Sequence, residues 1–277
     1  MSERYELNIT SPSYFDGIDE SEVVFHALNK SGSMALENVM REAFDYAGRS
    51  DEFLSHYKIG GRIESFCKLV SKKKSKFVVA HYLYGALKPR KRRIWITQFR
   101  HPLPKFLSTY NWIKLKTEKK SGKPFMSLKK FALNPKLIKH NLIYQFGAEW
   151  EKFKNHGESA PTAKSLYEAS LVALETHVHS LTLAERFEES LFLVARLCGL
   201  SSLAPWIRDN RNPGRKLSHE ISAEEREIID QALYYDYQLY NYAVNRFERQ
   251  IMQIDFGDNL ENYKQVCLNQ YKDRLLV

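Results

Sequence analysis

The amino-acid sequence predicts an α/β protein with three layers, in which helices cover both faces of a central parallel sheet, followed by a helical C-terminal region. Three short apolar runs, at residues 23–28, 77–80 and 94–99, show no polar alternation, which is typical of strands buried on both faces. Helical periodicity separates these runs, and alternating strands and helices favour a parallel sheet. A fourth strand is expected at residues 177–183.

Helices are expected between and after these strands. The first follows a short polar loop and places Leu36, Val39 and Met40 on one apolar face. The last begins with Ser222, three residues before Glu225, which is the pattern of a capping box. The expected helices span residues 33–48, 62–72, 104–118, 135–155, 163–175, 187–198 and 222–251.

The composition indicates a folded protein of one domain, residues 1–277, with an N-terminal extension at residues 1–20. Hydrophobic residues make up 43% of the 277 residues, enough for a sizeable core. The apolar runs are far shorter than the roughly 18 residues of a membrane-spanning helix. The N-terminus has no apolar signal region. A cytoplasmic protein without a membrane span is therefore expected.

The cysteines and histidines predict neither a disulfide framework nor a metal site. Cys67, Cys198 and Cys267 are widely spaced and odd in number, which is typical of a reducing compartment. His177 and His179 form a pair, but the sequence offers no nearby acidic or cysteine ligand to complete a metal site.

The net charge of +9 predicts an anionic partner. Much of the excess lies in basic clusters at residues 72–76, 88–93 and 114–123, which are most often solvated faces or loops. No nucleic-acid-binding motif accompanies this charge, so nucleic acid is not an expected partner.

The loop that joins the first strand to the first helix is the most informative segment. It contains Lys30, Ser31, Gly32, Ser33 and Met34. Small residues allow a ligand to approach the backbone, and the first amides and the dipole of the helix favour an anion there. The lysine precedes the glycine, so the segment does not match the Walker A pattern of nucleoside triphosphatases. The sequence thus predicts an anion site of another kind.

Each of the three apolar runs ends next to a polar side chain: Lys30, His81 or Arg100. Because the carboxyl ends of parallel strands meet at one edge of a sheet, we expect these side chains to converge on one crevice. A histidine at the end of a strand can cap it through hydrogen bonds. Beside an anion site it can also act as a general base, so both interpretations of His81 stay open here.

The segment after Arg100 predicts a second phosphate site. Prolines end the strand and begin a helix on which Lys105, Ser108 and Trp112 share one face. A guanidinium group and a serine hydroxyl near a helix start are a suitable pair of donors for phosphate oxygens.

Taken together, these segments resemble the sulfotransferases that use 3′-phosphoadenosine 5′-phosphosulfate (PAPS), in particular the heparan sulfate 2-O-sulfotransferase branch and its bacterial relatives. Residues 29–34 resemble the family loop that binds the 5′-phosphosulfate. Residues 100–110 resemble its 3′-phosphate motif, with Arg100 and Ser108 as the two phosphate-binding residues. Residues 79–81 correspond to the segment that holds the catalytic histidine of this branch.

Two later segments extend the resemblance to residues 20–250. Residues 183–191 are similar to a family segment that precedes a core helix. Residues 212–216, followed by a long helix, resemble the C-terminal loop that covers the donor. By this match Arg215 and Lys216 would bind the donor.

The resemblance implies a P-loop-like α/β domain with PAPS as donor and no metal. Lys30 and His81 would be catalytic, the acceptor would be a saccharide or another small hydroxylated molecule, and residues 114–160 would form a helical lid on the acceptor side. The chain departs from the family at His101, where an acidic residue is usual, and at Lys105, where an arginine is usual. A nucleotide-dependent kinase and a non-catalytic nucleotide- or polyanion-binding module are the alternatives.

Overall fold

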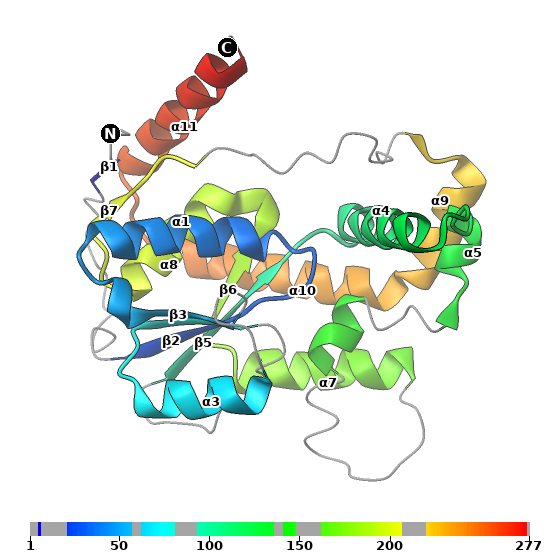
Figure 1. Ribbon diagram of the computed structural model, residues 1–277, viewed down its shortest axis with the longest axis horizontal. Coiled ribbons are helices and arrows are strands. Elements are labelled where there is room, and N and C mark those ends of the chain that lie inside the picture. The colour runs from blue at the N-terminus through cyan, green and yellow to red at the C-terminus, as the bar shows by residue number, and fades with distance from the viewer. Residues whose placement is uncertain are drawn as a thin grey trace.

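The computed structural model of the chain contains a central sheet of five parallel strands (Figure 1). It describes residues 5–6, 21–56, 62–80, 93–135, 141–147, 162–206 and 220–275. The strands are β2 (Glu22–His26), β3 (Phe53–Ser55), β4 (Phe77–Ala80), β5 (Arg93–Phe99) and β6 (Ser180–Leu183), arranged in the order β3-β4-β2-β5-β6. The three strands expected from apolar runs are confirmed, whereas the short strand β3 was not expected.

The burial of the strands explains their composition. All residues of β4 and β5 are buried, as are four of the five residues of β2. The register pairs His26 with Ala80 on one side and with Thr97 on the other, so β2 and β4 end at the same level and β5 continues to Phe99. Thr97 Oγ1 also donates to the carbonyl of His26 at 3.0 Å, which satisfies a polar side chain inside the sheet.

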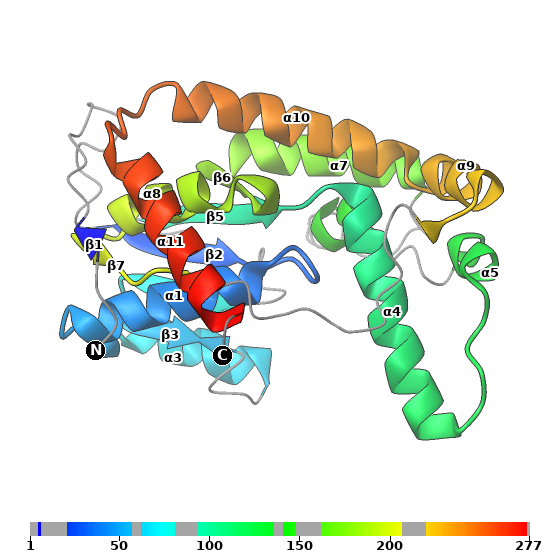
Figure 2. The same cartoon turned by 90° about the horizontal axis from the view of Figure 1, so that it is seen from above.

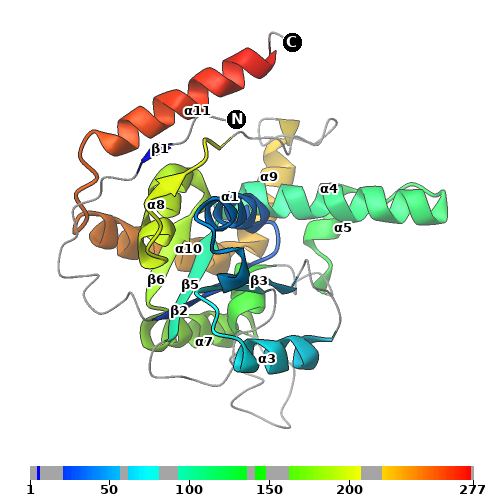
Figure 3. The same ribbon diagram turned by 60° about the vertical axis from the view of Figure 1, so that its left-hand side comes forward.

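Helices cover both faces of this sheet, as expected for a three-layer α/β architecture (Figures 1 and 3). One face carries α1 (Ser33–Tyr46) and α8 (Phe187–Leu197), and the other carries α3 (Ile63–Lys72) and α7 (Ala163–Thr176). The long helix α10 (Tyr234–Ile251) packs along β6 and α7. In the described ranges, no helix has the length and apolar character needed to span a membrane.

Three other helices lie beyond the carboxyl ends of the strands and share a second hydrophobic cluster. Helix α4 (Pro102–Ser121) follows β5 and points away from the sheet (Figure 2). Its buried face packs with α5 (Leu128–Ala132) and α9 (Ala223–Ala232). The side chains of this cluster include Leu103, Phe106, Leu107, Tyr110, Leu128, Phe131, Ile229 and Leu233.

The prediction of a single helix at 222–251 is wrong, because the chain forms α9 and α10, which meet at Leu233. The predicted capping box at Ser222 and Glu225 is present at the start of α9. The break lets Leu233 pack in the second cluster while Leu239 and Phe247 of α10 pack in the main core. Helical periodicity alone does not predict that the two halves of this segment pack in two different hydrophobic clusters.

Other expected boundaries also need correction. The strand expected at 177–183 begins only at Ser180, because His177 ends α7 and its N–H donates to the carbonyl of Ala173. Of the helix expected at 135–155, the described part is helical at 142–147, and 136–140 and 148–155 lie outside the described residues. Helix α11 (Asn259–Leu275), the one-turn segments η2 (Ser50–Glu52) and η4 (Ala184–Arg186), and the antiparallel pair β1 (Tyr5–Glu6) and β7 (Ser202–Leu203) were not expected.

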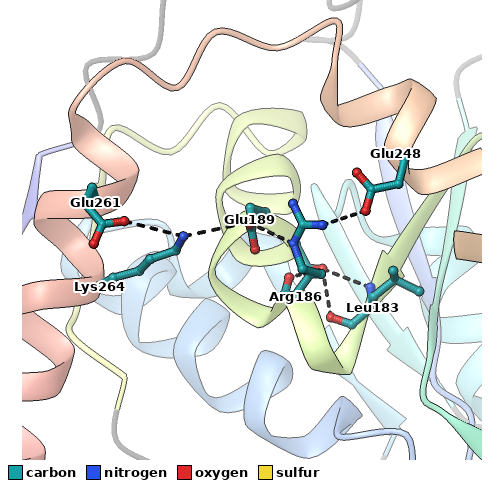
Figure 4. A network of polar contacts seen from close by, with 7 residues as sticks. Leu183, Arg186, Glu189, Glu248, Glu261 and Lys264 are labelled. Atoms are coloured by element: carbon teal, nitrogen blue, oxygen red, sulfur yellow. Dashed lines mark hydrogen bonds and ion pairs between the residues drawn. The ribbon is translucent and has the colours of Figure 1, made fainter.

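A polar network fixes the segment that follows β6 (Figure 4). Arg186 donates to Glu189 at 2.9 Å and to Glu248 at 2.6 Å, which joins η4 to α8 and α10. Lys264 of α11 lies 3.8 Å from the same Glu189 carboxylate. The N–H of Leu183 donates to Ser190 Oγ at 2.9 Å. These contacts hold Ala184 and its neighbours against the end of the sheet.

Gln250 on α10 satisfies the outer edge of β6. Its Oε1 accepts a hydrogen bond from the N–H of Leu181, and its Nε2 donates to the carbonyl of Leu181, both at 3.1 Å. An edge strand otherwise presents unpaired backbone groups, so the side-chain amide here replaces a further strand.

Replacing Gln250 by Met should destabilise the fold by about 2–4 kcal/mol, because the buried N–H and C=O of Leu181 would both lose their partner. The free energy of unfolding in urea measures this change. Gln238→Met, on the exposed side of the same helix, is the matched control and should change stability by less than about 0.5 kcal/mol. Equal effects of the two substitutions would contradict the role assigned to Gln250.

Candidate anion-binding site

The loop at residues 29–34, called the Lys30 loop below, lies where the strand order changes direction. The chain passes from β2 towards β3 on one side of the sheet, and later crosses from β4 to β5 on the other. In open parallel sheets such a point is where ligands bind, outside the carboxyl ends of the strands. Of the three side chains expected to converge, Lys30 and Arg100 follow β2 and β5 at this edge of the sheet, and His81 lies outside the described residues.

The backbone of the Lys30 loop is held in an unusual conformation. Lys30 has a φ of 62° and Gly32 a φ of 81°, both in the left-handed region. For a lysine this conformation costs about 1–2 kcal/mol. The N–H of Ser31 and the hydroxyl of Ser33 both donate to the carbonyl of Leu28, at 3.4 and 3.2 Å, and close the turn.

Helix α1 begins directly after this turn. No side chain of the described ranges caps its N-terminus, and no acidic residue lies in its first turn. The first amides of a helix have no acceptor within the helix, and the helix dipole adds partial positive charge at the same place. Ser33 is buried there and Met34 is exposed. The positive potential at the N-terminus of α1 therefore favours an anionic ligand.

Two buried polar side chains in this region have polar atoms with no hydrogen-bond partner among the residues that the structure describes. Ser31 Oγ is one, and both the oxygen and the nitrogen of the Gln98 amide are the others. The two side chains are fully buried. Gln98 Nε2 lies 3.3 Å from the position that a Cβ atom on Gly32 would take. Buried polar groups are nearly always paired, so these groups indicate a site built for a polar ligand or water.

Three cationic side chains gather around the Lys30 loop. Arg100 Nη1 donates to the carbonyl of Lys30 at 3.2 Å. The ammonium groups of Lys30 and Lys116 lie 5.5 and 4.2 Å from the ring centroid of Trp112. Burial lowers the pKa of Lys30, and the charges of Arg100 and Lys116 lower it further. The mutual repulsion of these cations would be relieved by a bound anion.

The remaining predicted site residues fall into two groups. Ser108 lies half-buried on α4, between the fully buried Lys105 and the exposed Trp112, so the predicted shared face runs from the interior to the surface. His81, Arg215 and Lys216 lie outside the described residues. Their predicted roles stay predictions.

His101, a departure from the sulfotransferase motif that this segment resembles, is the N-cap residue of α4 and follows Arg100 directly. Its N–H donates to Glu185 at 2.9 Å, and its ring lies edge-on to the rings of Tyr237 and Tyr240. Burial lowers the pKa of His101, although the Glu185 carboxylate opposes this shift. A neutral side chain here leaves the charge of the adjacent Arg100 available to a ligand.

Lys105, the second departure from the motif that this segment resembles, is buried close enough to Asp236 for their charges to interact. Burial lowers the pKa of Lys105 to about 8, an effect that Asp236 opposes and Arg100 reinforces. The side chain is thus part of the interior beneath the site, a position that sequence spacing on the helix did not reveal.

Two residues of the site were missed in the sequence, Gln98 and Gln145. Gln98 carried a signal, because it is a polar residue inside the apolar run at 94–99. Gln145 Oε1 accepts a hydrogen bond from the N–H of Asn29 at 3.1 Å, across 116 positions of the chain. No local sequence pattern predicts a contact between residues so far apart in the chain.

The histidine pair considered for a metal has another role. His179 Nδ1 accepts a hydrogen bond from the N–H of Trp95 at 3.0 Å, and burial lowers the pKa of both His177 and His179. Within the part of the chain that the structure describes, no group of three or more His, Cys, Asp and Glu side chains is arranged to hold a metal ion.

No protein-family model matches the chain, and no curated protein is significantly similar to it. The function is therefore inferred from the geometry of the site and from the motifs in the sequence.

Gly32→Ala should destabilise the protein by about 1–2 kcal/mol, because the added methyl group favours a negative φ and would crowd the Gln98 amide. Gly48→Ala is the matched control, since Gly48 also has a positive φ but no atom within 4 Å of the added Cβ. Urea unfolding should show the larger loss for Gly32→Ala. If Gly32→Ala lowers the free energy of unfolding no more than Gly48→Ala does, the added Cβ atom does not crowd the Gln98 amide.

The lowered pKa of His101 predicts a difference in stability at acidic pH. As the pH falls below about 6.5, the unfolded chain takes up this proton before the folded chain does. The stability of the wild-type protein should therefore fall relative to that of His101→Phe, which keeps an aromatic ring against Tyr237 and Tyr240. Urea unfolding at pH 5, 6 and 7 measures the difference, and a gap that does not change with pH would contradict it.

Proposed function

We propose that the protein is a PAPS-dependent sulfotransferase that transfers a sulfuryl group to a hydroxyl of a saccharide or another small hydroxylated acceptor. The observation that carries the proposal is the hydrogen bond from Arg100 to the carbonyl of Lys30. It brings the arginine of the sequence motif for a 3′-phosphate to the loop whose sequence resembles a 5′-phosphosulfate loop. A donor with anionic groups at both positions suits such a pair.

The fit of the donor can be judged on the residues present. The N-terminus of α1 and the unpartnered Ser31 hydroxyl offer donors for the oxygens of a phosphosulfate. Arg100 offers a guanidinium to the 3′-phosphate, with Ser108 on the following helix as its proposed partner. The loop has no Walker A lysine after the glycine, which disfavours a nucleoside triphosphate as donor. The residues therefore suit a P-loop-like site for PAPS.

In this proposal, the residues of the site act on a single displacement at sulfur. PAPS supplies the sulfuryl group, whose bond to the 5′-phosphate oxygen breaks as the acceptor oxygen bonds to sulfur. His81 takes the proton of the acceptor hydroxyl as a general base. Lys30 neutralises the charge that develops on the departing phosphate oxygen, and the amides of residues 31–34 donate to the surrounding oxygens. The Arg215 and Lys216 segment covers the donor.

Binding of adenosine 3′,5′-bisphosphate, the product that PAPS leaves, tests this proposal. At a ligand concentration of 100 times Kd, the wild-type protein should gain about 2.7 kcal/mol, seen as a rise in Tm of several degrees. ATP with Mg²⁺ should give a smaller shift. Stabilisation by ATP with Mg²⁺ alone would indicate a kinase, and no response to either nucleotide would overturn the assignment.

Lys30→Gly separates the charge of Lys30 from its backbone conformation, because glycine adopts a positive φ without strain. This variant should fold with a Tm equal to or above that of the wild type and lose most of the shift with adenosine 3′,5′-bisphosphate. Lys120→Ala, at an exposed position on α4, is the control for general charge and should keep the shift. Equal losses in both variants would indicate a polyanion-binding surface without a specific site.

A further inference from the structure

A short helical segment, residues 142–147, lies against the Lys30 loop and the strands beside it. Gln145 accepts the hydrogen bond from the N–H of Asn29. The ring of Phe146 lies 5.6 Å from the ring of His26 at the end of β2 and 6.3 Å from that of Phe99 at the end of β5. The segment therefore contacts both strands that lead into the candidate site.

The start of this segment is held by a side chain from a distant helix. Asp236 of α10 is buried, and its two carboxylate oxygens accept hydrogen bonds from the N–H groups of Leu142 and Ile143, at 2.9 and 3.0 Å. The carboxylate thus takes the place of an N-cap residue, although it lies more than 90 positions away in the chain. Ser170 Oγ of α7 donates to the carbonyl of Ile143 at 3.2 Å and holds the same turn from another side.

The charge of Asp236 also interacts with that of Lys105 of α4, which is buried as well. Burial raises the pKa of Asp236, and the two amides and Lys105 oppose that shift. The geometric effect of Asp236 is specific, because its contacts with the N–H groups of Leu142 and Ile143 join α10 to residues 142–147.

We infer that Gln145 and Asp236 are positioning residues for the Lys30 loop, an inference that rests on the proposed function. Asp236 fixes the start of the 142–147 segment, and the segment fixes the amide oxygen of Gln145. Gln145 then holds the N–H of Asn29, while Arg100 holds the carbonyl of Lys30 from the other side. Lys30 is thereby kept in its left-handed conformation, from which its ammonium group reaches the donor.

Amide hydrogen exchange of Asn29, measured by NMR on uniformly labelled protein, tests this inference independently of any ligand. In Gln145→Met, which removes the acceptor oxygen at nearly constant length, the Asn29 amide should exchange at least about tenfold faster than in the wild type, for loss of about 1.4 kcal/mol. Tyr263→Phe, which removes one buried hydrogen bond to the carbonyl of Ala204, is the matched control and should leave this rate unchanged.

The role of Asp236 is tested in a variant that does not leave the charge of Lys105 buried without an opposite charge nearby. The double variant Lys105→Met with Asp236→Asn removes both buried charges and keeps one acceptor oxygen at position 236. It should also speed exchange of the Asn29 amide, since one of the two amides of residues 142 and 143 loses its acceptor. Unchanged exchange in both Gln145→Met and the double variant would overturn the inference.

Affinity for adenosine 3′,5′-bisphosphate separates this inference from the proposed function. If both hold, Gln145→Met should weaken binding by about tenfold, and Tyr263→Phe should bind as the wild type does. If the wild type does not bind this nucleotide, the proposed function fails while the exchange rates still decide whether Gln145 and Asp236 hold the loop. Faster exchange with unchanged affinity would overturn the claim that this positioning serves the donor.

Discussion

The hydrogen bond from Arg100 to the carbonyl of Lys30 joins the ends of two neighbouring parallel strands, and the candidate site depends on it. It can form because β2 and β5 are neighbouring parallel strands, paired up to His26 and Thr97, so the segments that follow them leave the same edge of the sheet. It brings a guanidinium next to a lysine whose backbone is already left-handed. Two cations at the N-terminus of α1 repel each other, and a bound anion would relieve this repulsion.

Costly features accumulate around this one edge of the sheet. They are the left-handed backbone of Lys30, the polar atoms of Ser31 and Gln98 that have no hydrogen-bond partner among the described residues, and the buried charged side chains of Lys105 and Asp236. Away from this edge, the capping box of α9 and the amide of Gln250 on β6 satisfy backbone groups locally. Unfavourable local features are typical of functional sites, where stability gives way to the arrangement of charge.

The sequence predicted those parts of the fold that depend on local pattern. Apolar runs located β2, β4 and β5, and the loop composition pointed to Lys30 and its neighbours, because burial on both faces and helix starts have local signatures. The division at Leu233 was missed, since periodicity does not distinguish two cores. Gln145 and Asp236 were not recognised as parts of the site either, because their roles arise from contacts with residues far away in the chain. Long-range hydrogen bonds of single side chains leave no periodic trace.

The most direct test of the central claim is a crystal structure of the protein with adenosine 3′,5′-bisphosphate. We expect the 5′-phosphate at the N-terminus of α1, within hydrogen-bond distance of the amides of residues 31–34 and of Lys30. We expect the 3′-phosphate on Arg100 and Ser108. A nucleotide bound away from the Lys30 loop, or one bound there with its 3′-phosphate in solvent, would contradict the proposed sulfotransferase site.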